Sequence, residues 1–193
     1  MTSNKVTCGC EEATGNQMSC CGSSKGQSAC CGAEERTSRR LLIEFLYIDL
    51  TTCDRCLDTD AILGEACADV ALILRSAGYI LDVRKILVET EAQAQQLKFA
   101  SSPTIRINGH DIQLDFRESS CACCGDIAGV ETDCRVWVWQ GQEYTTPPKA
   151  MLIDAILRYI YGGVAKTKVA SQVDGYQVPD NLKRFFAANS IRK

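Results

Sequence analysis

The chain has 193 residues, of which 46% are hydrophobic, and a formal net charge of -3 at pH 7. This length suits one domain with appendages, and the small net charge gives no reason to expect nucleic acid or an acidic membrane surface as a partner. Residues 1–40 contain no apolar run that resembles a signal peptide, and the longest apolar stretch, 41–50, contains Glu44 and Asp49. We therefore expect a cytoplasmic protein without a membrane segment.

Thirteen cysteines and one histidine restrict the chemistry open to this chain. In a reducing compartment so many cysteines are not expected to form a disulfide framework, and an odd number cannot all pair within one chain. With a single histidine, a multi-ligand transition-metal site must be mostly or wholly sulfur. The composition therefore points to soft or thiophilic ions.

Residues 1–40 predict a flexible arm, because they are rich in Gly, Ser, Cys and charge and cannot bury enough surface to fold alone. A ten-residue repeat in this arm carries two Cys-Cys-Gly motifs, and Ala-Cys-Cys-Gly returns at 122–125. We interpret the paired thiols as bidentate ligands that capture an ion and pass it to a better site by ligand exchange. These thiols are Cys20, Cys21, Cys30 and Cys31. The alternative is a low-complexity tail with no task.

The pattern of apolar residues predicts a folded domain over 41–163 and a polar C-terminal extension over 164–193. The first predicted elements are a central strand at 41–48, a helix at 57–76, a strand at 79–88 and a short helix from a capping box at Thr90 and Gln93 to about Phe99. Next come a strand entered at 102–105, a hairpin turn at Asn108-Gly109, a strand at 110–116, a cysteine-bearing loop at 117–134 and a strand at 135–139.

Two helices complete the predicted order. The first is capped by Thr146, has Pro147 at its first position and ends at Gly162-Gly163. The second is a short helix around Leu182, Phe185 and Phe186, which we expect to dock on the domain. The resulting order is β-α-β-α-β-β-α with one insertion, a cysteine-rich loop and an extra strand, before the last helix of the domain. This order predicts an α/β fold with right-handed crossovers.

Cys53 and Cys56 form a Cys-x-x-Cys motif where the first strand runs into the first helix. Helix amides and the positive end of the helix dipole favour a thiolate over a thiol at this junction, which is typical of a reactive dithiol. The alternatives are two incidental core cysteines, or half of a structural zinc site whose other half is Cys121 and Cys124.

The dithiol and Ser102-Pro103-Thr104, just before the hairpin strands, resemble the thioredoxin-like superfamily over 41–163. The resemblance implies that Cys53 is the exposed nucleophile, that Cys56 is the buried resolving thiol, and that Pro103 is a cis-proline opposite them. More narrowly, the chain is similar to an uncharacterised thioredoxin-like family, a domain of unknown function with extra cysteines before its last helix. That label supplies no activity.

The dipeptide inside the dithiol departs from the superfamily, because Asp54-Arg55 stands where thioredoxins have Gly-Pro. Arg55 is expected to lower the pKa of a nearby thiolate and Asp54 to raise it. The redox potential of thioredoxins therefore does not carry over to this chain.

The cysteine-bearing loop contains four candidate ligands, Cys121, Cys123, Cys124 and Cys134. Adjacent cysteines do not easily offer both sulfurs to one tetrahedral ion, so we expect a poor zinc knuckle. A three-thiolate site for As(III), or a two- or three-thiolate site for Hg(II), tolerates such short spacings better. The alternative is a loop stabilised by a disulfide or by zinc. Vicinal cysteine pairs on a thioredoxin-like fold are also similar to those of the arsenite metallochaperones.

Three functions follow from these patterns. The first is a cytoplasmic thiol protein that binds and transfers As(III) or Hg(II) in detoxification, with a thiol-bearing protein as a further partner; it requires the loop to fold over the dithiol. The second is a thiol–disulfide oxidoreductase, in which Cys53 attacks a disulfide and Cys56 resolves the mixed disulfide, with thiol-assisted cleavage of a carbon–metal bond as a variant. The third is a zinc-stapled interaction domain without turnover.

Overall fold

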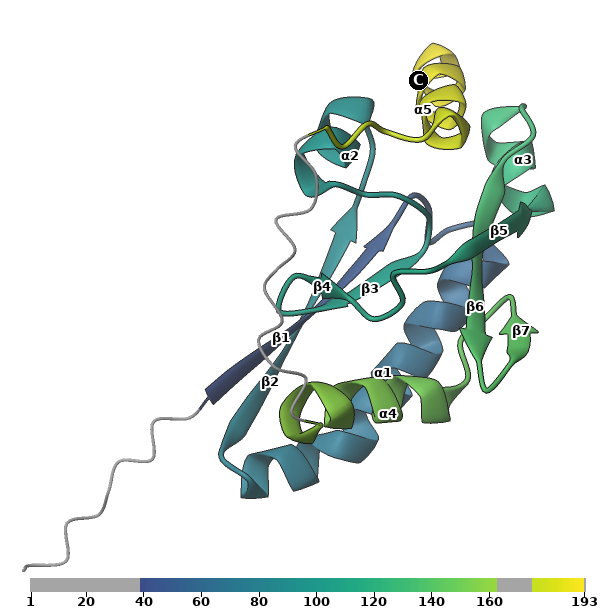
Figure 1. Cartoon of the computed structure of the whole chain (residues 1–193). Helices are drawn as coiled ribbons and strands as arrows, with labels where there is room; N and C mark the ends of the chain where they lie inside the picture. Colours follow the sequence, from purple (N-terminus) through teal and green to yellow (C-terminus); the bar gives the residue numbers. More distant parts are fainter. Residues whose placement is uncertain (1–38, 163–174, 193) are drawn as a thin grey trace, which may run out of the picture. The chain divides into compact units, whose positions relative to one another are not determined.

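The computed structural model describes residues 39–162 and 175–192 (Figure 1). Its strands are β1 (Arg39–Tyr47), β2 (Tyr79–Leu87), β3 (Thr104–Ile107), β4 (His110–Asp111), β5 (Arg117–Ser120), β6 (Asp133–Trp139) and β7 (Gln142–Tyr144). Its helices are α1 (Asp54–Ser76), α2 (Glu91–Leu97), α3 (Ala122–Ala128), α4 (Lys149–Tyr161) and α5 (Asp180–Arg192). None of these helices combines the length and apolar character needed to cross a membrane. The predicted ligands Cys20, Cys21, Cys30 and Cys31 lie outside the described residues.

The main sheet has the strand order β2-β1-β3-β4. β1 pairs with β2 in parallel and with β3 antiparallel, which confirms the prediction that it is a central strand. β3 turns back into β4 at Asn108 and Gly109, whose φ angles of 48° and 81° suit a two-residue hairpin turn. The predicted α/β class is confirmed.

Side chains of β1 are divided between two buried clusters, because neighbouring strand residues point to opposite faces. Leu41, Ile43 and Phe45 pack with α1 and α4. Leu46, and Ile48 just beyond the strand, pack with α2, α5 and most of the buried cysteines. The cysteines therefore belong to one of the two cores of the fold.

Between β4 and α4 the chain forms a second sheet, in the order β5-β6-β7. The predictions of a strand over 110–116 and of a loop over 117–134 are wrong, because β4 ends at Asp111 and the supposed loop contains β5, α3 and the start of β6. The chain leaves β3 because polar side chains bind β6 instead. The Asp111 carboxylate accepts two hydrogen bonds from the Arg135 guanidinium, and the Gln113 amide oxygen accepts the Val138 N–H.

The first helix begins at Asp54, with Cys53 as its N-cap, and not at residue 57 as predicted. The Asp49 carboxylate is the reason for the early start. It accepts the backbone N–H groups of Thr51, Thr52 and Cys53, and these bonds turn the chain directly from β1 into α1.

Of the predictions for the other helices, one is wrong and two are confirmed. α4 begins at Lys149 with Pro148 as its N-cap, so the predicted cap at Thr146 is wrong. Pro147 precedes another proline, and a residue in that position is kept out of the helical region. The capping box at the start of α2 is confirmed. The docked helix near the C-terminus is also confirmed as α5, with buried side chains at Leu182, Phe185 and Phe186.

Candidate metal centre

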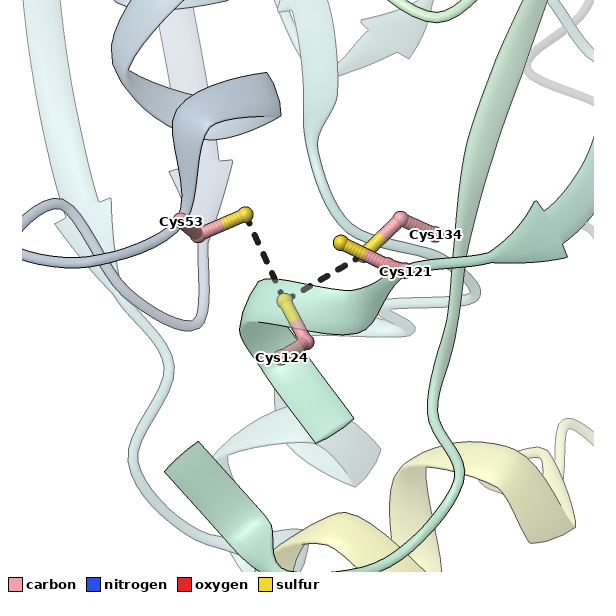
Figure 2. A group of neighbouring side chains, drawn as sticks. All are labelled: Cys53, Cys121, Cys124 and Cys134. Carbon is pink, nitrogen blue, oxygen red and sulfur yellow. Dashed lines mark hydrogen bonds between the residues drawn. The ribbon is translucent and has the colours of Figure 1, made fainter. Parts of the chain in front are cut away.

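Four cysteine sulfurs from three separate segments meet in the structure (Figure 2). Cys53 is the N-cap of α1, Cys121 is the N-cap of α3, Cys124 lies within α3 and Cys134 lies in β6. All four Sγ atoms lie within 4.8 Å of one another. The Sγ atom of Cys124 is 3.3 Å from that of Cys53 and 3.3 Å from that of Cys134. We call these residues the four-thiol group.

The four-thiol group is closed to solvent. Cys53, Cys124 and Cys134 are 0% exposed, and Cys121 is 3% exposed. The expectation that Cys53 is an exposed nucleophile is therefore wrong. The cause is the insertion before α4, which brings Cys124 of α3 against Cys53 at the start of α1.

Arg55, between the two cysteines of the dithiol, ties α1 to the insertion. Its guanidinium donates hydrogen bonds to the carbonyl oxygens of Ser119 (3.3 Å), Ser120 (2.8 Å) and Cys134 (3.4 Å), and to the Ser119 hydroxyl (3.0 Å). These acceptors stand just before Cys121 and at Cys134. Because hydrogen bonds from a charged donor are strong, one side chain holds both ligand-bearing segments against α1.

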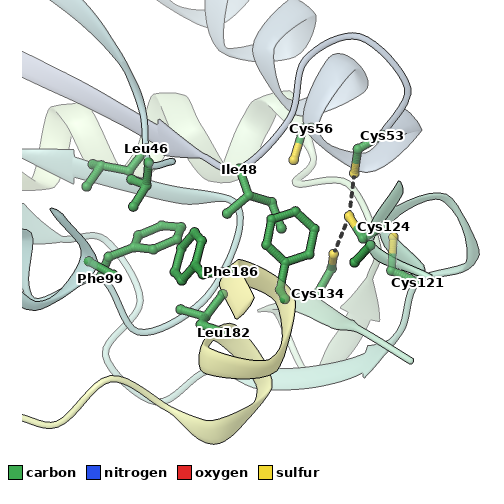
Figure 3. Packing of buried hydrophobic residues seen from close by; sticks show 14 of the residues in the cluster. Leu46, Ile48, Cys53, Cys56, Phe99, Cys121, Cys124, Cys134, Leu182 and Phe186 are labelled. Carbon is green, nitrogen blue, oxygen red and sulfur yellow. Dashed lines mark hydrogen bonds between the residues drawn. The ribbon is translucent and has the colours of Figure 1, made fainter. Parts of the chain in front are cut away.

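The C-terminal helix α5 packs against the same region (Figure 3). Leu182, Phe185 and Phe186 belong to the buried cluster that contains the four-thiol group. The Asn181 amide accepts the Asp133 N–H at 3.0 Å and donates to the Asp133 carbonyl oxygen at 2.8 Å. Since Asp133 precedes Cys134, Asn181 holds the backbone that carries one ligand.

The pKa values of the four thiols differ because their side chains hydrogen-bond to one another. Hydrogen bonding to Cys121 first, and then to Cys124, Cys134 and Cys56, holds the pKa of Cys53 far below its usual value. Hydrogen bonding to Cys124 and Cys134 lowers the pKa of Cys121 to about 6. The pKa values of Cys124 and Cys134 are raised, each mainly by hydrogen bonding to Cys121. Cys53 and Cys121 are therefore the thiols that lose a proton most readily, and Cys124 and Cys134 are those that hold theirs.

The second cysteine of the dithiol, Cys56, is not one of the four. It is fully buried, and its Sγ atom lies 3.6 Å from the Ser102 hydroxyl. Hydrogen bonding to Cys53, together with burial, raises the pKa of Cys56. The Ser102–Pro103 peptide is cis, as the resemblance implied, and the Ser102 carbonyl oxygen accepts the Arg135 N–H at 2.7 Å. The proline loop therefore lies beside both the dithiol and β6.

Cys123 also lies outside the four-thiol group. It is half-buried, and its Sγ atom lies 3.7 Å from Oδ2 of Asp54. Adjacent residues of a helix point about 100° apart, so Cys123 and Cys124 face different surroundings. The predicted ligand Cys123 is therefore not among the four sulfurs that the structure brings together. The two adjacent cysteines do not face one tetrahedral ion, as expected.

The donor set fits a thiophilic ion. Four sulfurs around a tetrahedral ion at about 2.3 Å stand about 3.8 Å apart. Two of the observed Sγ–Sγ distances are 3.3 Å, and none exceeds 4.8 Å, so the tetrahedral value lies within the observed range. Its Cys121-x-x-Cys124 spacing is also that of zinc sites, so the argument against zinc from adjacent cysteines does not apply to these four residues. The four-thiol group can hold a metal ion.

Sequence reasoning missed two residues that build this site. For Arg55 the sequence predicts only an effect of its charge on a nearby thiolate, although a long donor side chain inside the dithiol can reach a neighbouring segment. Asn181 carried no local signal, because its partner Asp133 lies 48 residues away in the chain.

Comparison with known proteins places the chain in a family. Residues 41–156 match the family model described as Domain of unknown function (DUF2703), and the chain belongs to this family. The match confirms the expected membership of an uncharacterised family, covers the whole four-thiol group and ends before α5. No curated protein and no solved structure matches the chain.

Proposed function

We propose that the protein binds a soft metal or metalloid ion, As(III) or Hg(II), at the four-thiol group and passes it to another thiol ligand, as a cytoplasmic detoxification protein. The observation that carries the proposal is the meeting of four buried sulfurs from Cys53, Cys121, Cys124 and Cys134 within 4.8 Å. Thiolates are the protein ligands that select soft ions. An ion bound there also neutralises the buried negative charge of any thiolate in the group, which is otherwise costly.

Two further thiols favour transfer over a permanent structural metal. Cys56 is in contact with Cys53, and Cys123 stands next to Cys124 on the solvent side. A structural zinc site needs only its four ligands, whereas an ion that moves by ligand exchange needs spare thiols nearby. We therefore treat the ion as cargo.

The proposal includes a thioredoxin-like scaffold. Support comes from the strand order β2-β1-β3-β4, from the parallel pairing of β1 with β2, and from the cis peptide at Pro103 close to Cys56. On this scaffold the insertion adds Cys121, Cys124 and Cys134 to the first cysteine of the dithiol. The dithiol thereby becomes part of a larger sulfur site.

Titration of reduced full-length protein with Zn(II), As(III) and Hg(II), followed by calorimetry and native mass spectrometry, tests this function. To isolate the group, the background chain carries serine at Cys8, Cys10, Cys20, Cys21, Cys30 and Cys31. Cys124→Ser is expected to weaken As(III) or Hg(II) binding at least about tenfold, since loss of a residue that only supports a ligand already costs that much. Cys67→Ser is the matched control, because Cys67 is buried in the other core cluster. Equal binding by both variants contradicts the proposal, and zinc that neither ion displaces favours the interaction-domain alternative.

A thiol–disulfide oxidoreductase is the second candidate, favoured by the lowered pKa of Cys53 and by its contact with Cys56. In that reaction the insertion must first uncover Cys53, which is 0% exposed. Reduction of insulin disulfides, with Cys53→Ser as the test and Cys67→Ser as the control, decides between the two. Activity that is lost only in Cys53→Ser supports this candidate.

A further inference from the structure

The sulfurs of the four-thiol group offer almost no direct access to an ion that arrives on a carrier. Its cysteines are 0–3% exposed. Soft ions pass between thiols by exchange, in which the incoming sulfur must touch the ion, so exchange depends on access. Among residues 39–162 and 175–192, Cys123 is the one cysteine that is not buried.

Two contacts between α1 and α3 involve consecutive residues of each segment. In the buried contact, the Sγ atoms of Cys53 and Cys124 are 3.3 Å apart. In the outer contact, Oδ2 of Asp54 and Sγ of Cys123 are 3.7 Å apart. The half-buried thiol therefore stands one residue from a ligand of the group, with a carboxylate beside it.

We propose that Cys123, assisted by Asp54, is the receiving thiol that takes the ion from a thiol carrier and hands it to the four-thiol group. This inference rests on the proposed function and adds the route by which the site is loaded. It also assigns a task to a cysteine that is not among the four ligands.

The exchange proceeds in two steps without oxidation or reduction. In the first, the Cys123 sulfur bonds to the ion, the bond between the ion and the carrier sulfur breaks, and the Cys123 proton passes through the Asp54 carboxylate to the departing carrier thiolate. In the second, the Cys53 thiolate displaces the Cys123 sulfur from the ion, and Cys123 takes a proton from the solvent. Cys124 then bonds to the ion, the bond between the ion and the remaining carrier sulfur breaks, and the Cys124 proton leaves with that carrier thiol.

Loading kinetics test this route. The probe is Hg(II) bound by two molecules of 2-mercaptoethanol, mixed with the full-length chain that carries serine at the six arm cysteines. The ultraviolet absorbance of the Hg–S bonds reports loading. Cys123→Ser is expected to load about tenfold more slowly, because exchange rates follow the access and ionisation of the attacking thiol. Its equilibrium affinity is expected to stay within about twofold of the parent.

The remaining variants distinguish a receiving thiol from a permanent ligand. Asp54→Asn is expected to slow loading while leaving affinity unchanged, Cys67→Ser to change neither, and Cys123→Ala to repeat the result of Cys123→Ser. Unchanged loading by Cys123→Ser overturns the inference, and so does an affinity that falls together with the rate, since Cys123 would then be a permanent ligand. If the parent chain binds no Hg(II), the proposed function itself fails, which is a different result.

Discussion

The guanidinium of Arg55 and the carbonyl oxygen of Cys134, 79 residues apart in the chain, are joined by a hydrogen bond of 3.4 Å. The same guanidinium binds Ser119 and Ser120, just before Cys121. One side chain from inside the dithiol thus holds three of the four ligands close to the fourth, Cys53. The Asp54-Arg55 dipeptide has a structural role that the charge of Arg55 alone does not explain.

Replacing Arg55 by Gln is expected to weaken As(III) or Hg(II) binding about tenfold, because the ligand segments lose their charge-assisted hydrogen bonds to α1. Arg55→Lys keeps the charge but not the forked donor geometry, so it restores only part of the affinity. Arg84→Gln, at an exposed position of β2, is the control. Calorimetric titration measures the effect. Full affinity in Arg55→Lys is the result that assigns the role to charge instead.

Replacing Asn181 by Ala is expected to increase the rate of ion release, because Asp133 and the following Cys134 lose their link to α5. Two half-buried backbone groups lose their partner, so the free energy of unfolding is also expected to fall by about 1 kcal/mol. Release is followed with a chelating dithiol, and stability by urea unfolding. Asn189→Ala on the same helix is the control. A release rate equal to that of the control contradicts this prediction.

The affinity for Hg(II) is expected to rise with pH. A thiol loses its proton when it binds an ion, and the raised pKa values of Cys124 and Cys134 mean that both are protonated in the ion-free protein at neutral pH. Cys121, with a pKa of about 6, also takes up a proton below that pH, so affinity falls more steeply there. Calorimetry in buffers of different ionisation enthalpy counts the released protons. Affinity that does not change between about pH 5.5 and about pH 7.5 contradicts this assignment.

The ion pair between the buried Arg135 and the half-buried Asp111 is expected to stabilise the folded insertion. Arg135 is 0% exposed, and its guanidinium binds both carboxylate oxygens of Asp111 and the Thr104 hydroxyl. Asp111→Asn leaves a buried charge without its partner, which costs about 3–5 kcal/mol of unfolding free energy. Arg40→Gln, which removes an exposed ion pair with Asp82, is expected to cost less than about 1 kcal/mol. Urea unfolding compares the two variants.

Local sequence patterns predict the elements that depend on local interactions. The apolar run of β1, the capping box of α2 and the Asn108-Gly109 turn are all present. The strand predicted over 110–116 failed although its residues alternate. Leu114 in that segment is 67% exposed, because Asp111 and Gln113 bind β6 and draw the chain away from β3. No local pattern contains these distant contacts.

For the candidate ligands, too, the sequence does not contain the distant contacts that decide their positions. Sequence spacing named the dithiol and the loop cysteines, but it could not separate Cys53 from Cys56 or Cys124 from Cys123. That separation depends on α3, a helix of seven residues that the loop prediction did not contain. Within this helix Cys124 faces Cys53, whereas Cys123 faces Asp54.

X-ray absorption spectroscopy of the one-to-one complex with As(III) or Hg(II) tests the central claim most directly. The sample is the full-length chain with serine at the six arm cysteines, so that sulfur must come from the remaining residues. We predict a first shell of sulfur alone around As(III), which loses a sulfur neighbour when Cys121 and Cys124 are both replaced by serine and is unchanged in Cys67→Ser. A shell that contains oxygen or nitrogen in the parent chain, or one that the double replacement leaves intact, contradicts the claim that the four-thiol group binds the ion.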